Sequence, residues 1–144
     1  MKSLLLLLAL TLSSTSYAIN CRSVEILGNA GSAYILNEVN QEIAGFTQKL
    51  TKRKTLVIKR ADSVSFNGCN AEMKILVSVK RKIRRNADGY ILLTATVNEF
   101  NGRKVCLSNA KVKRVRLSHT ATLGEAVYKL VANKALPNQT CFNL

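Results

Sequence analysis

The most regular pattern of apolar and polar positions lies in residues 73–84. Nearly every odd position there is apolar, and the even positions are mostly basic. A period of two is typical of a β-strand, because successive side chains of a strand point to opposite faces. The segment therefore predicts a strand with one apolar face and one basic face.

Two turn signals extend this strand into a sheet. The Asp88-Gly89 dipeptide is typical of a tight hairpin, and an alternating segment, residues 90–100, follows it. Asn101-Gly102 predicts a second hairpin turn, which leads into a strand over residues 103–117. The apolar parity shifts within this last strand near Asn109, which predicts a β-bulge.

Helical periodicity occurs in two other segments. Ser32 is a suitable cap for a helix that runs to about Leu50, with apolar residues at steps of three and four. Thr122 and Glu125 form a capping box at the start of a second amphipathic helix, which ends before Pro137. The predicted buried stripe of this second helix consists of Leu123, Val127, Leu130 and Val131.

Two short runs of strand type, residues 21–27 and 55–59, complete the order of elements as β-α-β-β-β-β-α. A strand cannot bury its apolar face alone, so the helices are expected to cover one side of the sheet. The predicted fold class is α+β. It is a two-layer sandwich, in which two helices lie on one face of an antiparallel-rich sheet of four to five strands.

Residues 1–18 have the pattern of a cleavable secretory signal. A lysine precedes a leucine-rich core, and small residues near the end predict cleavage after Ala18. The apolar run is far shorter than the ~20 residues of a membrane-spanning helix. Asn20 before Cys21 argues against a lipoprotein signal. We expect an exported protein, periplasmic or secreted, in which residues 19–144 form a single domain.

All four cysteines lie in that domain, namely Cys21, Cys69, Cys106 and Cys141. In an oxidising compartment an even number of cysteines predicts two disulfides, with three possible pairings. The wide cysteine spacings and the single histidine disfavour a metal site. We favour a Cys69–Cys106 bond across the middle of the fold, with a Cys21–Cys141 bond that joins the ends.

Basic residues greatly outnumber acidic ones: 22 Lys and Arg against 8 Asp and Glu give a formal net charge of +14. Such a domain attracts polyanions and anionic surfaces through its long-range field. The basic face of the strand over residues 73–84 would be the open side of the sheet in a two-layer fold. We predict that this face is the core of an anion-binding site, formed by Lys74, Lys80, Lys82 and Arg84. Supporting charge is expected from Lys52, Arg53, Lys54, Lys113, Arg114 and Arg116.

The favoured anions are the phosphates of a lipid headgroup or glycolipid, because Lys and Arg alone can satisfy them. Nucleic acid is an alternative, for which Tyr90 and Phe100 beside the basic strand offer stacking surfaces. The low aromatic content, 6% with no tryptophan, favours lipid. We predict a binding protein with at most peripheral membrane contact. The alternatives are an envelope-assembly or scaffold component that binds protein, and a secreted bacterial effector that acts on host membranes or nucleic acid.

No motif indicates catalysis. His119 is the only histidine, and its neighbours do not form a nucleophile-histidine-acid motif, so we predict that it is a loop residue. The eight acidic residues do not cluster as the paired carboxylates of glycoside cleavage require. We therefore expect no enzyme activity, no metal and no cofactor.

Residues 72–136 contain four segments whose pattern is shared with a known class of domain: KILV (74–77), GYILLTA (89–95), NGRKV (101–105) and EAVYKL (125–130). The strand, hairpin, Asn-Gly turn and closing helix that they predict resemble the α/β domains of bacterial envelope proteins. Examples are the curli secretion protein and the N-terminal domain of the Tol-system translocation protein. The chain departs from that pattern in its four cysteines and its basicity. The resemblance implies a binding or assembly role in the envelope.

Overall fold

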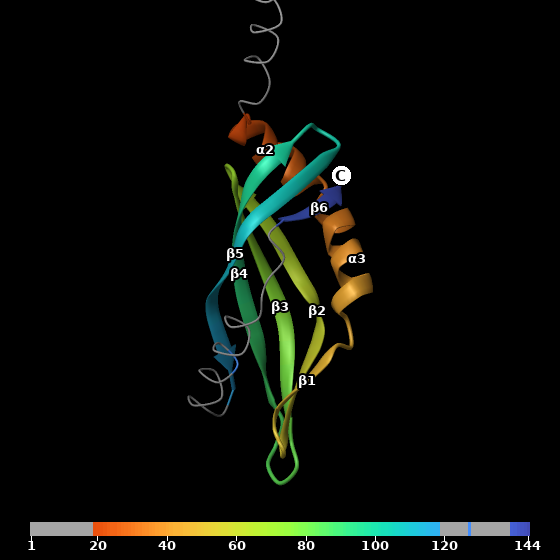
Figure 1. The fold of residues 1–144 in the computed structure, drawn as a ribbon, viewed down its shortest axis with the longest axis vertical. Helices are drawn as coiled ribbons and strands as arrows, with labels where there is room; N and C mark the ends of the chain where they lie inside the picture. Colours follow the sequence, from red (N-terminus) through yellow and green to blue (C-terminus); the bar gives the residue numbers. More distant parts are fainter. Residues whose placement is uncertain (1–18, 119–126, 128–138) are drawn as a thin grey trace, which may run out of the picture.

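The structure is a computed structural model that describes residues 19–118, 127 and 139–144. In this part of the chain there are two helices and six strands, and all six strands pair antiparallel in chain order (Figure 1). The helices are α2 (Cys21–Ala30) and α3 (Ser32–Ile43). The strands are β1 (Thr47–Thr51), β2 (Lys54–Asn67), β3 (Asn70–Arg81), β4 (Ala87–Phe100), β5 (Lys104–Leu117) and β6 (Gln139–Asn143).

The sheet curls into a half-barrel, and α2 and α3 pack against β2 (Figure 1). The predicted two-layer sandwich with four to five strands in the order β-α-β-β-β-β-α is therefore wrong. Register shifts interrupt the β1–β2, β2–β3 and β4–β5 pairs. Each bulge bends its strand and increases the local twist, so a long meander curls instead of staying flat.

Residues 21–27 form part of helix α2, where the sequence predicted a strand. Asn20 is the N-cap of this helix, because its side-chain oxygen accepts hydrogen bonds from the backbone N–H groups of Arg22 and Ser23. Val24 and Gly28, four positions apart, form its buried face. A run of seven residues is compatible with both helical and strand periodicity. Here the Asn20 cap and the packing of α2 against β2 favour the helix.

Helix α3 begins at Ser32, but the N-cap is Gly31 and not Ser32 as predicted, and the helix ends at Ile43, seven residues before the predicted end at Leu50. Gly45 adopts a left-handed φ of 80°, which suits glycine and takes the chain out of the helix. The Gly45 N–H then donates to the carbonyl of Ile58. Of the residues that continue the helical spacing, Phe46 lies just before β1 and Leu50 lies in β1.

The three central strands match the sequence prediction closely. Strand β3 contains most of the predicted segment 73–84 but ends at Arg81, and β4 and β5 confirm the segments 90–100 and 103–117. The predicted hairpin turn at Asp88-Gly89 is wrong, because both residues belong to β4 and pair with Ser78 and Val77, and the connecting loop is residues 82–86. The predicted bulge is confirmed as well. Asn109 has a φ of 54°, and the register between β4 and β5 shifts beside it.

Strand β2 is much longer than the predicted segment 55–59. Two register shifts, between Ile58 and Arg60 and between Ala61 and Ser63, break its apolar alternation. Strand β6 was not predicted, because its short, mainly polar sequence has no strand signal of its own. The predicted signal peptide (1–18), His119 and the second predicted helix lie outside the described residues, except Val127, which is buried in the core.

The core lies between the helices and the concave face of the sheet. Val24 on α2 and Ile35 on α3 are fully buried and belong to one apolar cluster with the odd-numbered apolar residues of β3. The free edge of β2 is also covered by the helices. The Asn29 side chain exchanges two hydrogen bonds with the backbone of Phe66, and Asn40 does the same with Ala61. These amides occupy an edge that would otherwise be open to strand pairing.

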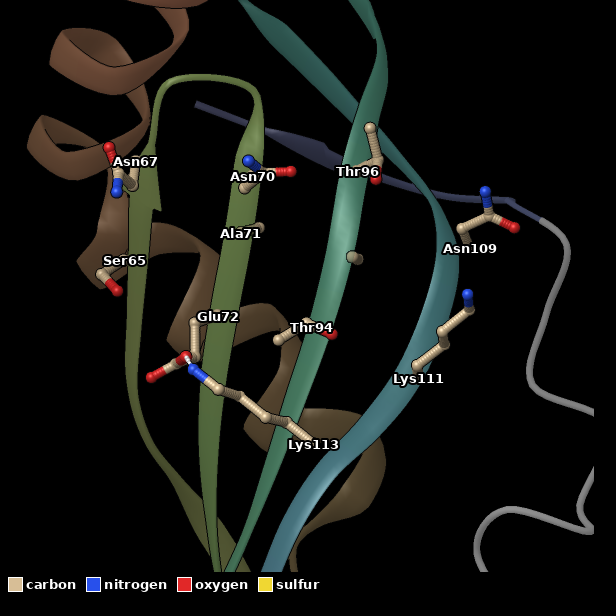
Figure 2. Close-up of a pocket in the computed structure, with 11 residues that line it drawn as sticks. Ser65, Asn67, Asn70, Ala71, Glu72, Thr94, Thr96, Asn109, Lys111 and Lys113 are labelled. Carbon is tan, nitrogen blue, oxygen red and sulfur yellow. Dashed lines mark hydrogen bonds and ion pairs between the residues drawn. The ribbon is translucent and has the colours of Figure 1, made fainter.

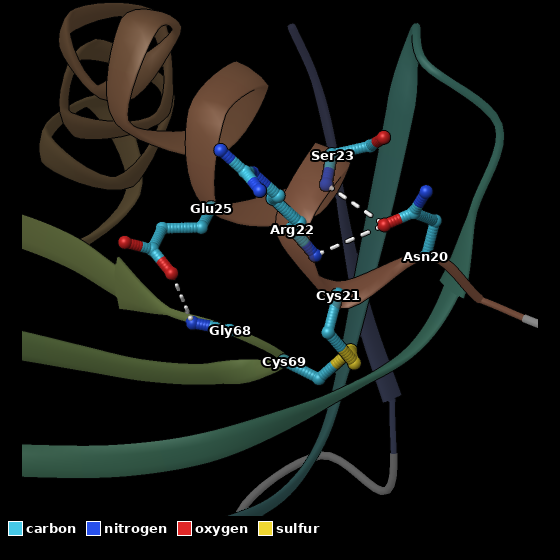
Figure 3. Close-up of a disulfide and its surroundings, with 7 residues drawn as sticks. All are labelled: Asn20, Cys21, Arg22, Ser23, Glu25, Gly68 and Cys69. Carbon is cyan, nitrogen blue, oxygen red and sulfur yellow. Dashed lines mark hydrogen bonds between the residues drawn. A yellow bond between two sulfur atoms is a disulfide. The ribbon is translucent and has the colours of Figure 1, made fainter.

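Two disulfides are present, as predicted, but the favoured pairing is wrong. Cys21 is bonded to Cys69, which ties the start of α2 to the β2–β3 turn (Figure 3). Beside this bond, the Glu25 carboxylate accepts a hydrogen bond from the Gly68 N–H at 2.9 Å. Cys106 is bonded to Cys141 directly across the β5–β6 pair. Two disulfides fit an oxidising compartment, either extracellular or periplasmic.

Candidate anion-binding surfaces

The outer face of the sheet is the side of β2–β5 that points away from the helices. Lys74 and Lys80 lie on this face, as the alternation predicted, because Val77 and Val79 between them are buried on the helix side. The two lysines make the outer face basic, although Ser78 between them on the same face is buried. The outer face contains only part of the predicted anion-binding core.

Lys74 has a partner within the sheet. Its Nζ atom lies 4.7 Å from the centre of the Tyr90 ring on the neighbouring strand. This cation–π contact covers the ring, so Tyr90 is a poor stacking surface for a base. Arg114 and Arg116 also lie on the outer face, because they pair with Leu92 and Tyr90 in the β4–β5 register.

Phe100 does not lie beside Tyr90 on the outer face. A register shift between Val97 and Glu99 reverses the parity of the end of β4, and Phe100 packs against the core. The stacking pair suggested by the sequence is therefore not formed, because one unpaired residue turns the next side chains to the opposite face.

A shallow polar groove of about 590 Å³ occupies the outer face near the β2–β3 turn (Figure 2). Lys113 reaches across β4 to the Glu72 carboxylate, and their charged atoms lie 2.8 Å apart. Lys113, which was predicted to provide supporting charge, is thus neutralised by an acid. The other polar residues that line the groove are Ser65, Asn67, Asn70, Thr94, Thr96, Asn109 and Lys111.

The remaining predicted residues meet at one end of the molecule. Lys82 and Arg84 are not on the face of β3, because the strand ends at Arg81 and they belong to the β3–β4 loop. The turn between β1 and β2 lies at the same end (Figure 1). The Lys82 N–H donates to the Arg53 carbonyl at 3.3 Å, which joins the two turns. We call this end the basic tip: Lys52, Arg53, Lys54, Lys80, Arg81, Lys82, Arg84 and Arg85.

The β3–β4 loop at the tip is held in place by its own hydrogen bonds. The Arg81 Nε–H donates to the Arg85 carbonyl at 2.8 Å, and Lys54 pairs with Arg81 in the β2–β3 register. A small cleft of about 140 Å³ lies between the two turns. Ile83, which the alternation placed on the buried face, projects from the loop and is 80% exposed.

The charge of the tip is not compensated by nearby acids. Residues 47–58 and 78–87 contain no Asp or Glu. Among the described residues, the four ion pairs involve Lys59, Arg60, Lys104 and Lys113, all outside the tip. Among the described residues, eight cations therefore share one end of the protein without an ion-pair partner, and solvent and counterions screen their mutual repulsion.

The sequence indicated most of this site but not its arrangement. Six tip residues were among the predicted anion-binding residues, whereas Arg81, Arg85 and Ile83 were not. The dense run Lys80-Arg81-Lys82 followed by Arg84-Arg85, just before a turn signal, was the available clue. It indicates a basic loop more strongly than the continuation of a strand.

In the described part of the chain, no group of three or more His, Cys, Asp or Glu residues could hold a metal ion. No helix there is long and apolar enough to cross a membrane. Comparison with known proteins gives no match, since no family model, no curated protein and no solved structure matches this chain.

Proposed function

We propose that this protein is exported and is a non-enzymatic peripheral membrane protein, which binds phosphorylated lipid headgroups through the basic tip. The observation that carries the proposal is the meeting of eight cations on two adjacent turns, without an acidic residue in either segment. A narrow end with this charge fits a planar anionic surface, because both turns can reach the same plane.

The charge is large enough for useful affinity. A basic residue near an anionic membrane contributes about 1 kcal/mol. Eight such residues acting together would give about 8 kcal/mol, which corresponds to a Kd of roughly 1 μM. The outer-face cations Lys74, Arg114 and Arg116 lie off this plane and add mainly to the long-range attraction.

Nucleic acid fits the tip less well than phosphorylated lipid. Sequence-tolerant binding of single strands relies on aromatic side chains interleaved with the cations. The tip segments contain no aromatic residue, and the two aromatic residues nearest the basic strand are covered by Lys74 or packed in the core. Binding to a charged lipid surface does not require aromatic side chains among the cations.

The test is flotation of the oxidised protein, recovered after export from an expression host, with vesicles of defined composition. Neutral vesicles are compared with vesicles that contain anionic phospholipid, phosphoinositide or lipopolysaccharide, at low and at physiological salt. We expect binding that depends on the headgroup and persists at physiological salt. Binding that is absent, or that ignores the headgroup and disappears with salt, would show that the charge acts only as a screened field.

Charge-reversed variants locate the contact. K80E/K82E/R84E changes three tip residues, and K111E/R114E/R116E makes the same change of charge on the exposed residues of β5. We expect the tip variant to weaken binding by at least about 100-fold, since three favourable contacts of about 1 kcal/mol each are lost. The β5 variant is expected to weaken it by less than about tenfold. Equal losses in the two variants would rule out the tip as the site.

A further inference from the structure

We propose that Ile83 inserts into the hydrocarbon edge of the bilayer, so that the protein stands end-on on the membrane. This inference rests on the proposed function and adds the depth and direction of binding. Of the exposed large hydrophobic side chains in the described residues, Ile83 is the most exposed, at 80%. It is also the one that lies within the basic tip.

An exposed apolar residue is ordinary on a protein surface, so exposure alone does not indicate a membrane contact. The position of Ile83 does. Ile83 belongs to the loop beyond the last β3–β4 pair. This loop lies at one end of the molecule, opposite α2 (Figure 1). Lys82 and Arg84 flank it directly, and Arg81 and Arg85 flank these in turn. The apolar side chain is thus surrounded by cations on both sides of the chain.

The loop is braced in a way that presents Ile83 instead of burying it. The Lys82 N–H bond to Arg53 and the Arg81 Nε–H bond to the Arg85 carbonyl hold the two arms of the loop. Between these anchors Ile83 lines the small cleft of the tip and stays 80% exposed. Because these bonds already hold the loop, binding requires little further ordering of its backbone. Most of the free energy gained by burying the Ile83 side chain can therefore contribute to affinity.

The arrangement matches the chemistry of the membrane interface. Lysine and arginine side chains are long, and their charged ends can stay at the phosphate level while an apolar neighbour enters the acyl boundary. Charge alone gives binding that weakens as the salt concentration rises. An inserted isoleucine adds a contribution that salt does not screen, which distinguishes this binding mode from adsorption.

Insertion at the tip fixes the orientation of the rest of the protein. Helix α2 and the Cys21–Cys69 disulfide lie at the opposite end of the molecule (Figure 1). The polar groove on the outer face lies toward that same end, beside the β2–β3 turn. In the end-on arrangement both are held away from the bilayer, where they are accessible to a soluble partner.

The test uses tryptophan as a depth probe, because the chain contains no tryptophan of its own. I83W is compared with I26W, which replaces an isoleucine that is 60% exposed on α2. We expect anionic vesicles to shift the I83W emission to the blue, and bromine-labelled acyl chains to quench it. The I26W emission is expected to stay unchanged. A bound I83W protein whose tryptophan is neither shifted nor quenched would overturn insertion and leave the proposed function standing.

Truncation of the side chain gives a second readout that does not rely on tryptophan. I83A should bind anionic vesicles roughly 10- to 50-fold more weakly than the wild type, as expected when three buried hydrocarbon groups are removed. I26A should bind like the wild type. Equal affinity of I83A and the wild type would contradict insertion. Failure of the wild type to bind any of these vesicles would overturn the proposed function and this inference with it.

Discussion

Asn40 provides a sharp test of how the sheet edge is stabilised. Its side-chain oxygen accepts a hydrogen bond from the Ala61 N–H at 2.6 Å, and its Nδ2 donates to the Ala61 carbonyl at 3.1 Å. Both bonds are partly buried. N40A removes the two partners and leaves the Ala61 N–H and C=O groups without them, under the cover of helix α3.

The expected cost follows from these two bonds. A hydrogen bond contributes about 1 kcal/mol net, and a buried group left unsatisfied costs about 1–3 kcal/mol. Because water has partial access to this edge, the cost of N40A should lie near the lower end of the range that these contributions allow. We expect a loss of about 2–3 kcal/mol in the free energy of unfolding. With an m-value of about 1–3 kcal/mol per molar urea, the midpoint of unfolding should fall by roughly 1–2 M.

The assay is urea unfolding of the oxidised protein, followed by circular dichroism. N37A is the matched control, because Asn37 is an exposed residue of the same helix, and both substitutions raise helix propensity equally. We expect N37A to change the free energy of unfolding by at most about 0.5 kcal/mol. If N40A and N37A unfold at the same urea concentration, the Asn40 amide does not stabilise the edge of β2.

Two further changes test the attachment of the helices to the sheet. A Cβ atom added at Gly28 would come within 2.6 Å of the Phe66 ring, so G28A should destabilise the protein by about 1–3 kcal/mol despite its gain in helix propensity. A G28A protein at least as stable as the wild type would show that α2 does not pack closely on Phe66. C21S/C69S opens a disulfide between residues 48 positions apart and should cost about 2–4 kcal/mol. A non-reduced digest should join the peptides of Cys21 and Cys69, and a Cys69–Cys106 peptide would refute this pairing.

Local sequence signals were sufficient for the central strands. The alternation in β3 and the Asn101-Gly102 turn act over a few residues, so they can be identified without knowledge of the fold. The bulge at Asn109 was predictable for the same reason, because a change of apolar parity is visible in the sequence. These features define β3, β4 and β5.

The errors arose where distant residues decide the structure. Residues 21–27 are helical because Asn20 caps them and Phe66 packs on Gly28, and neither contact is visible in a short run. The bulges of β2 interrupt its apolar alternation, so the sequence does not reveal its full length. Four cysteines at wide spacings allow three disulfide pairings, and only the fold distinguishes between them. The predicted anion-binding residues are divided between the outer face and the basic tip for a similar reason. Ile83 continues the alternation, so the sequence predicts a strand where the structure has a loop.

The most direct test of the central claim compares three variants of equal charge on vesicles that contain anionic phospholipid, at physiological salt. K52E/R53E/K54E and K80E/K82E/R84E change the two turns of the basic tip, and K111E/R114E/R116E changes the outer face. If the tip is one membrane-binding site, the first two variants lose affinity to a similar extent, at least about 100-fold, and the third loses less than about tenfold. If all three lose affinity equally, the membrane responds to net charge alone, and the claim that the tip is a binding site is wrong.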